Sequence, residues 1–132
     1  TAAERGLEVV LFVSEIGDQW LVYHAQRSYY EALLKAGVRI YMYKSPYVLH
    51  AKHLTVDDSI SVVGSSNMDI RSFSLNMEVS LLVYSKEFVK DMRKIEAKYF
   101  AASRELKLNQ WLKRPKLQKF ADNIARLTSA LQ

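Results

Sequence analysis

The stretch of sequence that decides the fold is HAKHLTVDDSISVVGSSN, residues 50–67. Two runs of strand-forming residues, 49–56 and 60–65, flank the turn-rich triplet Asp57-Asp58-Ser59. This arrangement predicts two strands joined by a tight hairpin.

Polar side chains are spaced alike on the two predicted strands. Side chains of a strand alternate between its faces, so His50 and Lys52 are expected on the same face of the first strand. Ser65 and Asn67 stand the same two positions apart at the end of the next strand. Four polar groups are therefore expected to converge at one end of the hairpin.

The sequence before the hairpin predicts a strand, a helix and a second strand. Residues 7–13 are short, apolar and rich in branched side chains, which is typical of a buried strand. Apolar residues recur at helical spacing over 19–36, and Gly37 suits the position after a helix end. A strand over 38–43 then completes a unit of the kind that builds parallel strand pairs.

The sequence after the hairpin predicts a third strand over 76–84, followed by a helix that Ser85 caps. The segment between the hairpin and this strand, 67–75, is polar and is expected to be irregular. The order β-α-β, β-meander, α predicts the α/β class, with a mixed central β-sheet flanked by helices.

The composition changes after Ser103, and Pro115 is well placed in the first turn of a last helix. The chain is thus expected to divide into a half-domain, 1–103, and a basic helical tail, 104–132. The last helix carries one apolar stripe, with its basic residues off the stripe: Leu117, Phe120, Ile124, Leu127 and Leu131, against Lys116, Lys119 and Arg126. Such a helix docks on protein or lies at a membrane interface, and we favour docking.

Composition narrows the classes of partner. The 132 residues include no Cys and three scattered His, which excludes disulfides and leaves too few ligands for a zinc site. No apolar run approaches the ~20 residues that cross a bilayer. The net charge of +5 favours an anionic partner: phosphate, lipid headgroups or nucleic acid. Because the chain starts without Met and enters strand-like sequence at once, we expect a fragment of a longer protein.

Glu78 is an acid within the otherwise apolar third strand, which is costly unless it has a partner. His50 is the natural candidate, because a carboxylate bonded to one ring nitrogen fixes the imidazole while the other nitrogen reacts. Lys52, Ser65 and Asn67 then offer donors to phosphate oxygens that gain charge in the transition state.

Each of these residues also has an ordinary structural interpretation. His50 alone would suit a hydrogen-bonded core histidine, and Ser65 and Asn67 would suit a turn. Glu78 would suit a surface salt bridge, but a lysine such as Lys52 has no structural reason to lie in a central strand. Their shared register favours a functional site. We assign no role to the other two histidines, His24 and His53.

The spacing His50-x-Lys52, four residues to Asp57, then six to Gly64-Ser65-x-Asn67, resembles the signature of the phospholipase D superfamily. Glu78 sits where that family usually places its histidine-orienting acid. Further motifs are similar to the C-terminal half of bacterial cardiolipin synthases: Asn67-Met68-Asp69-Ile70-Arg71-Ser72, Leu75-Asn76-x-Glu78, the segment 29–38 and Trp111-x-x-Arg114-Pro115.

The resemblance implies metal-free and cofactor-free transfer of a phosphatidyl group, typically from phosphatidylglycerol, to the hydroxyl of another phospholipid. Two motifs normally face each other across one site, where one histidine becomes a phosphohistidine and the other is general acid and then base. We give His50 the acid/base role, with Lys52 and Glu78 as catalytic partners. Asp57, Asp69 and Arg71 are expected to be structural support.

This sequence has one motif, so we expect either a preceding half with the first motif or a second copy of the chain as partner. The resemblance also implies a membrane surface as partner, a bacterial cell membrane as location, no nucleic acid, and an inactive isolated fragment. The alternative function is a phosphodiesterase or nuclease of the same superfamily that completes its site by homodimerisation. A third hypothesis, a non-catalytic scaffold, is opposed by retention of His50, Lys52, Asn67 and Glu78 together.

Overall fold

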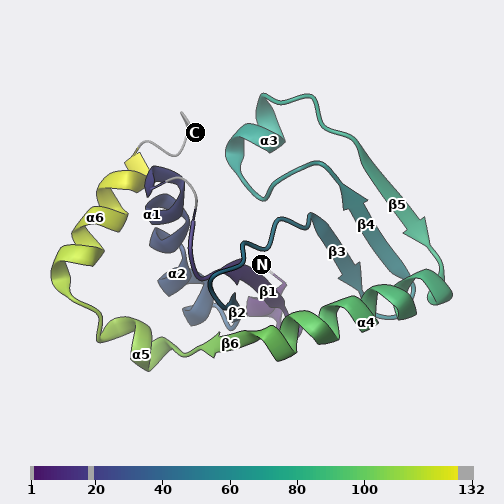
Figure 1. Ribbon diagram of the computed structural model, residues 1–132, viewed down its shortest axis with the longest axis horizontal. Coiled ribbons are helices and arrows are strands. Elements are labelled where there is room, and N and C mark those ends of the chain that lie inside the picture. The colour runs from purple at the N-terminus through teal and green to yellow at the C-terminus, as the bar shows by residue number, and fades with distance from the viewer. Residues whose placement is uncertain (1, 18–19, 128–132) are drawn as a thin grey trace. The chain divides into compact units, whose positions relative to one another are not determined.

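The computed structural model describes residues 2–17 and 20–127. The chain forms two compact units: unit 1 comprises 1–49 and 102–132, and unit 2 comprises 50–101. Both units contain helices and strands (Figure 1). The predicted α/β class is confirmed.

Unit 1 contains a mixed sheet of three strands in the order β1-β2-β6. β1 (Val10–Ser14) pairs in parallel with β2 (Arg39–Tyr43), with Val10 opposite Arg39. The predicted strand-helix-strand unit is therefore present. The third strand, β6 (Ser103–Leu106), lies antiparallel on the other edge of β2 and was not predicted.

The helix predicted over 19–36 is divided into α1 (Trp20–Ser28) and α2 (Tyr30–Lys35). At the break, the Ser28 hydroxyl donates to the carbonyl of Ala25 at 2.6 Å. A serine hydroxyl that bonds to a nearby carbonyl competes with the regular helical pattern. The first residue of α2, Tyr30, is fully buried and belongs to the core.

The core of unit 1 packs between this sheet and the helices. Tyr30 stacks near Trp111, with 5.2 Å between ring centroids. Trp111 comes from a short helix, α5 (Leu108–Leu112), that the sequence did not predict. The buried cluster draws on both ends of the chain: Val13, Tyr30, Val38, Ile40, Met42, Leu106 and Trp111. A 3₁₀ turn, Ala3–Arg5, places Ala3 against it.

The last helix, α6 (Lys116–Leu127), packs along α1 (Figure 1). Its buried side carries Asp122 and Ala125, which are fully buried. Leu117, Phe120 and Ile124 of the predicted apolar stripe are exposed instead. Leu131 and the Leu127 side chain lie outside the described residues. Helix α6 therefore turns a charged residue inward and apolar residues outward.

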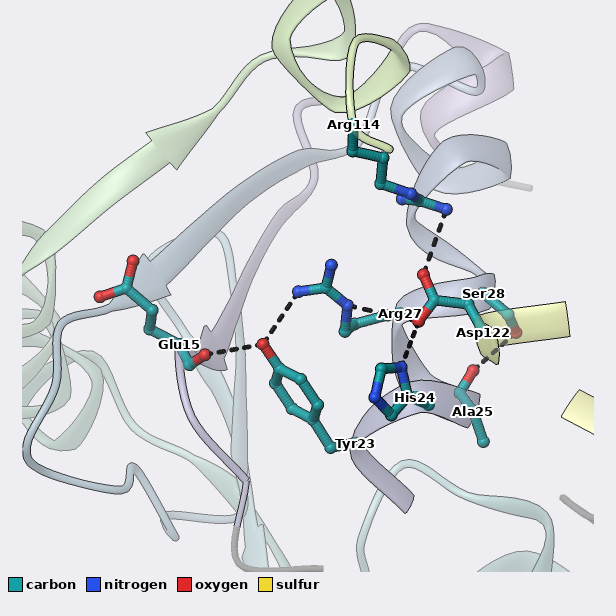
Figure 2. Close-up of polar contacts among 8 residues, drawn as sticks. All are labelled: Glu15, Tyr23, His24, Ala25, Arg27, Ser28, Arg114 and Asp122. Carbon is teal, nitrogen blue, oxygen red and sulfur yellow. Dashed lines mark hydrogen bonds and ion pairs between the residues drawn. The ribbon is translucent and has the colours of Figure 1, made fainter. Parts of the chain in front are cut away.

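The inward contact is a cluster of four charged or ionisable side chains, which we call the Asp122 cluster: His24, Arg27, Arg114 and Asp122 (Figure 2). Asp122 Oδ1 lies 2.6 Å from His24 Nδ1 and 3.4 Å from Arg27 Nε. Its Oδ2 lies 3.2 Å from Arg114 Nη2. Burial lowers the pKa of the Arg114 guanidinium, and the nearby Asp122 carboxylate opposes that shift. The cluster joins α1, the segment after α5, and α6.

Unit 2 contains an antiparallel sheet in the order β3-β4-β5, the predicted meander. Its strands are β3 (His53–Val56), β4 (Ile60–Gly64) and β5 (Ser80–Tyr84). Helix α4 (Lys86–Ala102) follows, and Ser85 Oγ accepts from Phe88 N at 3.2 Å, so the predicted cap is present. A short helix, α3 (Ile70–Ser74), lies in the segment predicted to be irregular.

Helix α4 is fixed to the sheet by Glu96, which is buried. Its Oε1 accepts from Thr55 Oγ1 at 2.7 Å and lies 3.4 Å from His53 Nε2. Arg93 on the same helix contacts the other carboxylate oxygen at 2.9 Å. These contacts give His53 a packing role between β3 and α4.

Within the described residues, six strands are divided between a mixed sheet in unit 1 and an antiparallel sheet in unit 2, where we expected one mixed sheet. The predicted boundary between 103 and 104 falls within β6. The division into a catalytic half and a tail stays a prediction.

Candidate active site

Three segments of unit 2 meet where strand β4 ends. Gly64 N donates to the carbonyl of Lys52 at 3.1 Å, and Ser65 N donates to the carbonyl of Val79 at 3.0 Å. A Cβ added to Gly64 would lie 2.5 Å from the Val79 carbonyl oxygen, so the close approach of these strands requires glycine here. The predicted site residues therefore lie on adjacent segments.

His50 and Lys52 lie just before β3, whereas we expected them within a strand. The hydrogen bond from Gly64 N to the Lys52 carbonyl extends the pairing with β4 to Lys52, but the strand itself begins at His53. His50 is exposed and Lys52 is half-buried. Lys52 Nζ donates to the carbonyl of His50 at 3.1 Å.

A second group of polar side chains, the Glu78 cluster, comprises Ser65, Ser72, Asn76 and Glu78. Ser65 Oγ donates to a Glu78 carboxylate oxygen and accepts from Val79 N at 3.1 Å. Asn76 Nδ2 donates to the other carboxylate oxygen at 3.5 Å. The carboxylate is thus oriented by neighbours from both sides.

The hydrogen bond from Ser65 is the main cause that lowers the pKa of the Glu78 carboxyl below its usual value. The Ser72 and Asn76 side chains lower it further, as does the positive charge of Lys52, while desolvation opposes them. The site therefore holds an ionised carboxylate close to a lysine.

Asp69 and Ser72 hold the loop that carries Asn67. The Asp69 carboxylate accepts from Ser72 N at 2.6 Å, the geometry of an N-cap on α3. The buried Ser72 hydroxyl accepts from Asn67 N at 3.1 Å. The Asn67 side chain itself is exposed. The side chain of Arg71, another predicted support, lies outside the described residues.

Asp57 lies at the opposite end of β3, in the turn to β4. Its backbone has a positive φ of 49°, a conformation that Asp tolerates better than most residues. Its carbonyl accepts from Arg93 Nη2 at 2.6 Å, which ties the turn to α4.

The structure brings Lys52, Ser65 and Glu78 together, while the predicted hydrogen bond between Glu78 and His50 stays a prediction. In the part of the chain that the structure describes, the His50 side chain has no hydrogen-bond or ion-pair partner. The sequence did not predict Ser72 as a partner of Glu78. The available signal was Asp69 three residues before Ser72, the spacing of a helix N-cap.

No three His, Asp or Glu side chains gather as metal ligands within 2–17 and 20–127. The predicted site residues provide an imidazole, a lysine cation, hydroxyl groups, an amide and an ionised carboxylate. Such groups suit binding and proton transfer at an anionic phosphoester.

Comparison with known proteins agrees with this arrangement. A family model described as cardiolipin synthase, PLD-like domain, matches residues 1–99. The chain belongs to this family of phospholipase D-like domains.

Curated relatives carry the same description in their names. The chain is 42% identical over 115 residues to cardiolipin synthase A of Wigglesworthia glossinidia brevipalpis, a match that covers 87% of this chain and 23% of the relative. It is 39% identical over 124 residues to cardiolipin synthase A of Escherichia coli O1:K1 / APEC, covering 94% of this chain and 25% of the relative. The chain thus spans about a quarter of the length of these relatives.

Proposed function

We propose that the chain is the C-terminal catalytic half of a cardiolipin synthase, which converts two molecules of phosphatidylglycerol into cardiolipin and glycerol. The observation that carries the proposal is the family match, taken with the His50-x-Lys52 segment lying beside Gly64-Ser65 and Glu78. The similarity to two cardiolipin synthases over most of the chain supports the choice of substrate.

In the first step, a histidine of the other motif attacks phosphorus of one phosphatidylglycerol. A nitrogen–phosphorus bond forms, giving a phosphohistidine, and the bond from phosphorus to the headgroup glycerol breaks. His50, protonated at this stage, gives its proton to the leaving glycerol oxygen.

In the second step, the now neutral His50 takes the proton from a hydroxyl of a second phosphatidylglycerol. The oxygen of this hydroxyl attacks phosphorus, and the nitrogen–phosphorus bond breaks with its electron pair returning to the first histidine. His50 ends protonated, as it began, and no metal ion or redox partner is needed.

The other site residues act on charge and orientation. Lys52 and Asn67 donate to the phosphoryl oxygens, whose negative charge grows as phosphorus becomes five-coordinate, and Ser65 joins them when its hydroxyl turns from Glu78 to the substrate. Glu78 orients the His50 imidazole and stabilises its protonated form. The lowered pKa of Glu78 supports this role, because the carboxylate is then ionised at neutral pH.

The site is completed by a partner, which we propose is a half that carries the first motif. The exposed His50 side chain supports this assignment, because its imidazole is accessible to a substrate held between two halves. We propose that the complete enzyme acts at the bacterial cell membrane and that the isolated fragment is inactive. No described helix of this chain is long and apolar enough to cross a bilayer.

The proposal is tested with the full-length protein and labelled phosphatidylglycerol. We expect cardiolipin and glycerol from the wild type, and a fall in rate of about 10²-fold or more for His50→Ala, since acid–base catalysis is lost. His53→Gln is the matched control, because His53 lies three residues away but contacts Glu96 in the packing of α4.

Two outcomes contradict the proposal. Cardiolipin formation by His50→Ala at the wild-type rate removes His50 from the chemistry. Cleavage of DNA without any cardiolipin formation replaces the lipid enzyme by a nuclease, and a concentration-dependent dimer would then supply the second histidine.

A further inference from the structure

Helix α6 is fixed to α1 by its polar side. Asp122 is completely buried, and its two carboxylate oxygens face His24 and Arg27 on α1 and Arg114 before α6 (Figure 2). A buried carboxylate with these partners cannot turn outward without leaving three ionisable groups uncompensated. The ionic contacts therefore set the rotation of α6 about its axis.

This rotation points the apolar stripe of α6 away from α1. Leu117 is 79% exposed, Phe120 63% and Ile124 47%. Large apolar side chains that recur every three or four residues on a helix normally mark the side that is buried. Here the three side chains on that side are exposed instead, so an apolar surface outside this structure is their natural partner.

An exposed tryptophan lies next to the same helix. Trp20, on α1, is 64% exposed, and its ring centroid is 4.5 Å from that of His24, which bonds to Asp122 of α6. Tryptophan has a large apolar ring and a polar N–H, a combination that is favoured where hydrocarbon meets water.

The charged residues in and near α6 favour one kind of partner, an anionic lipid surface, over a second copy of the chain. Asp122 is the only acid in the helix, and it is buried, so the outward side offers no carboxylate. The helix sequence includes three basic residues, Lys116, Lys119 and Arg126, and the exposed Lys113 comes shortly before it. A helix whose sequence has three basic residues and one buried acid favours an anionic lipid surface over a second copy of itself, because such a surface attracts cations and accepts an apolar stripe.

We propose that Leu117, Phe120 and Ile124, together with Trp20, form a surface that docks on an anionic lipid bilayer, with α6 lying in the plane of the interface. The inference rests on the proposed function, since it brings the half-site to the surface that contains its phospholipid substrate. The ionic contacts of the Asp122 cluster fix the rotation of α6 and so keep the apolar stripe facing the lipid.

The test is flotation of the 132-residue chain with vesicles of phosphatidylglycerol and phosphatidylcholine, compared with vesicles of phosphatidylcholine alone. We expect binding to the anionic vesicles that weakens as salt is added. The double substitution Leu117→Ser/Phe120→Ser is expected to weaken this binding by about tenfold or more, because apolar burial is lost.

A matched control, Leu7→Ser/Leu82→Ser, removes two leucines that are 58% and 54% exposed elsewhere in the chain. It is expected to bind vesicles as the wild type does. Circular dichroism of both double variants is expected to match the wild type, since all four side chains are exposed. His50→Ala is also expected to bind normally, which separates the α6 surface from the substrate site.

Three results overturn the inference. They are absence of wild-type binding to anionic vesicles, equal binding by Leu117→Ser/Phe120→Ser, and a stripe-dependent dimer in sedimentation with no effect on vesicle binding. Vesicle binding by a chain whose full-length protein makes no cardiolipin leaves the docking surface in place and counts against the proposed function alone.

Discussion

Two carboxylates collect polar partners in this chain, Asp122 in unit 1 and Glu78 in unit 2, and they differ in burial and in the kind of partner. Asp122 has no exposed surface and faces an imidazole and two guanidinium groups. Glu78 is near the surface and accepts mainly from a hydroxyl and an amide. A buried carboxylate among cations holds helices together, whereas a carboxylate held near the surface by neutral donors keeps its negative charge uncompensated by a direct ion pair among the described residues.

The largest expected effect comes from Asp122→Asn, which leaves three ionisable partners without their counter-charge. Breaking a buried ion pair of this kind is expected to cost about 3 kcal/mol of unfolding free energy. Urea denaturation at neutral pH measures it. Asp91→Asn is the matched control, because its ion pair with Lys94 is exposed and its loss is expected to leave the midpoint unchanged. Equal midpoints for the two variants would contradict the structural role of Asp122.

Glu78→Gln is expected to show the opposite pattern. The amide keeps the shape of the side chain but loses the charge that we propose orients and stabilises His50, so the rate of cardiolipin formation by the full-length protein is expected to fall on the order of 10²-fold. The urea midpoint is expected to stay at the wild-type value. A variant that unfolds readily while keeping full activity per folded molecule would give Glu78 a structural role instead.

Gly64→Ala tests the junction that holds the Glu78 cluster in place. A Cβ there would meet the Val79 carbonyl oxygen at 2.5 Å and also the Ser80 hydroxyl. Overpacking of this kind is expected to cost about 2 kcal/mol and to separate β4 from β5. Denaturation measures the cost, and Gly6→Ala is a control, because no atom lies within 4 Å of its added Cβ although its positive φ adds some strain. Equal stability of wild type and Gly64→Ala would argue against this close approach.

The smallest expected effect is a change in pH dependence. The Ser65 hydrogen bond favours the ionised Glu78, so its contribution to stability is present above the pKa of the unfolded chain and is lost as the pH falls through the lowered pKa of the folded protein. Carbon-13 NMR titration is expected to place this pKa below 4.5 in the wild type and closer to 4.5 in Ser65→Ala. Identical titration curves would show that Ser65 does not set the pKa.

Local sequence patterns predicted the parts of the fold whose signals are local. The hairpin around Asp57, the parallel strand pair and the cap at Ser85 are all present. The strand β6 was missed because Ser-Arg-Glu-Leu has no strong strand pattern and pairs with β2, about 60 residues away in the chain. The helix α3 was missed because it has only five residues, too few to show a helical repeat of apolar positions.

The sequence predicted which residues make up the candidate site, but it did not predict the contacts between them. Alternation along a strand placed His50 and Lys52 together, but the strand begins only at His53, and a local pattern does not fix where a strand begins. The Asp122 cluster escaped prediction for another reason. A helical pattern assigns the inner side to the apolar stripe. Nothing in the sequence of α6 alone indicates that Asp122 contacts His24 and Arg27 of α1.

The inverted orientation of α6 has a practical consequence for protein engineering. A hydropathy profile predicts that Leu117 and Phe120 are core positions that should not be substituted. It predicts that Asp122 is a surface position suitable for a tag, a label or a solubilising substitution. In the structure Leu117 and Phe120 are exposed and Asp122 is buried, so both of these predictions are wrong. A probe attached at Leu117 leaves the fold intact and reports on what the helix touches, whereas the same probe at Asp122 detaches the helix from the rest of unit 1.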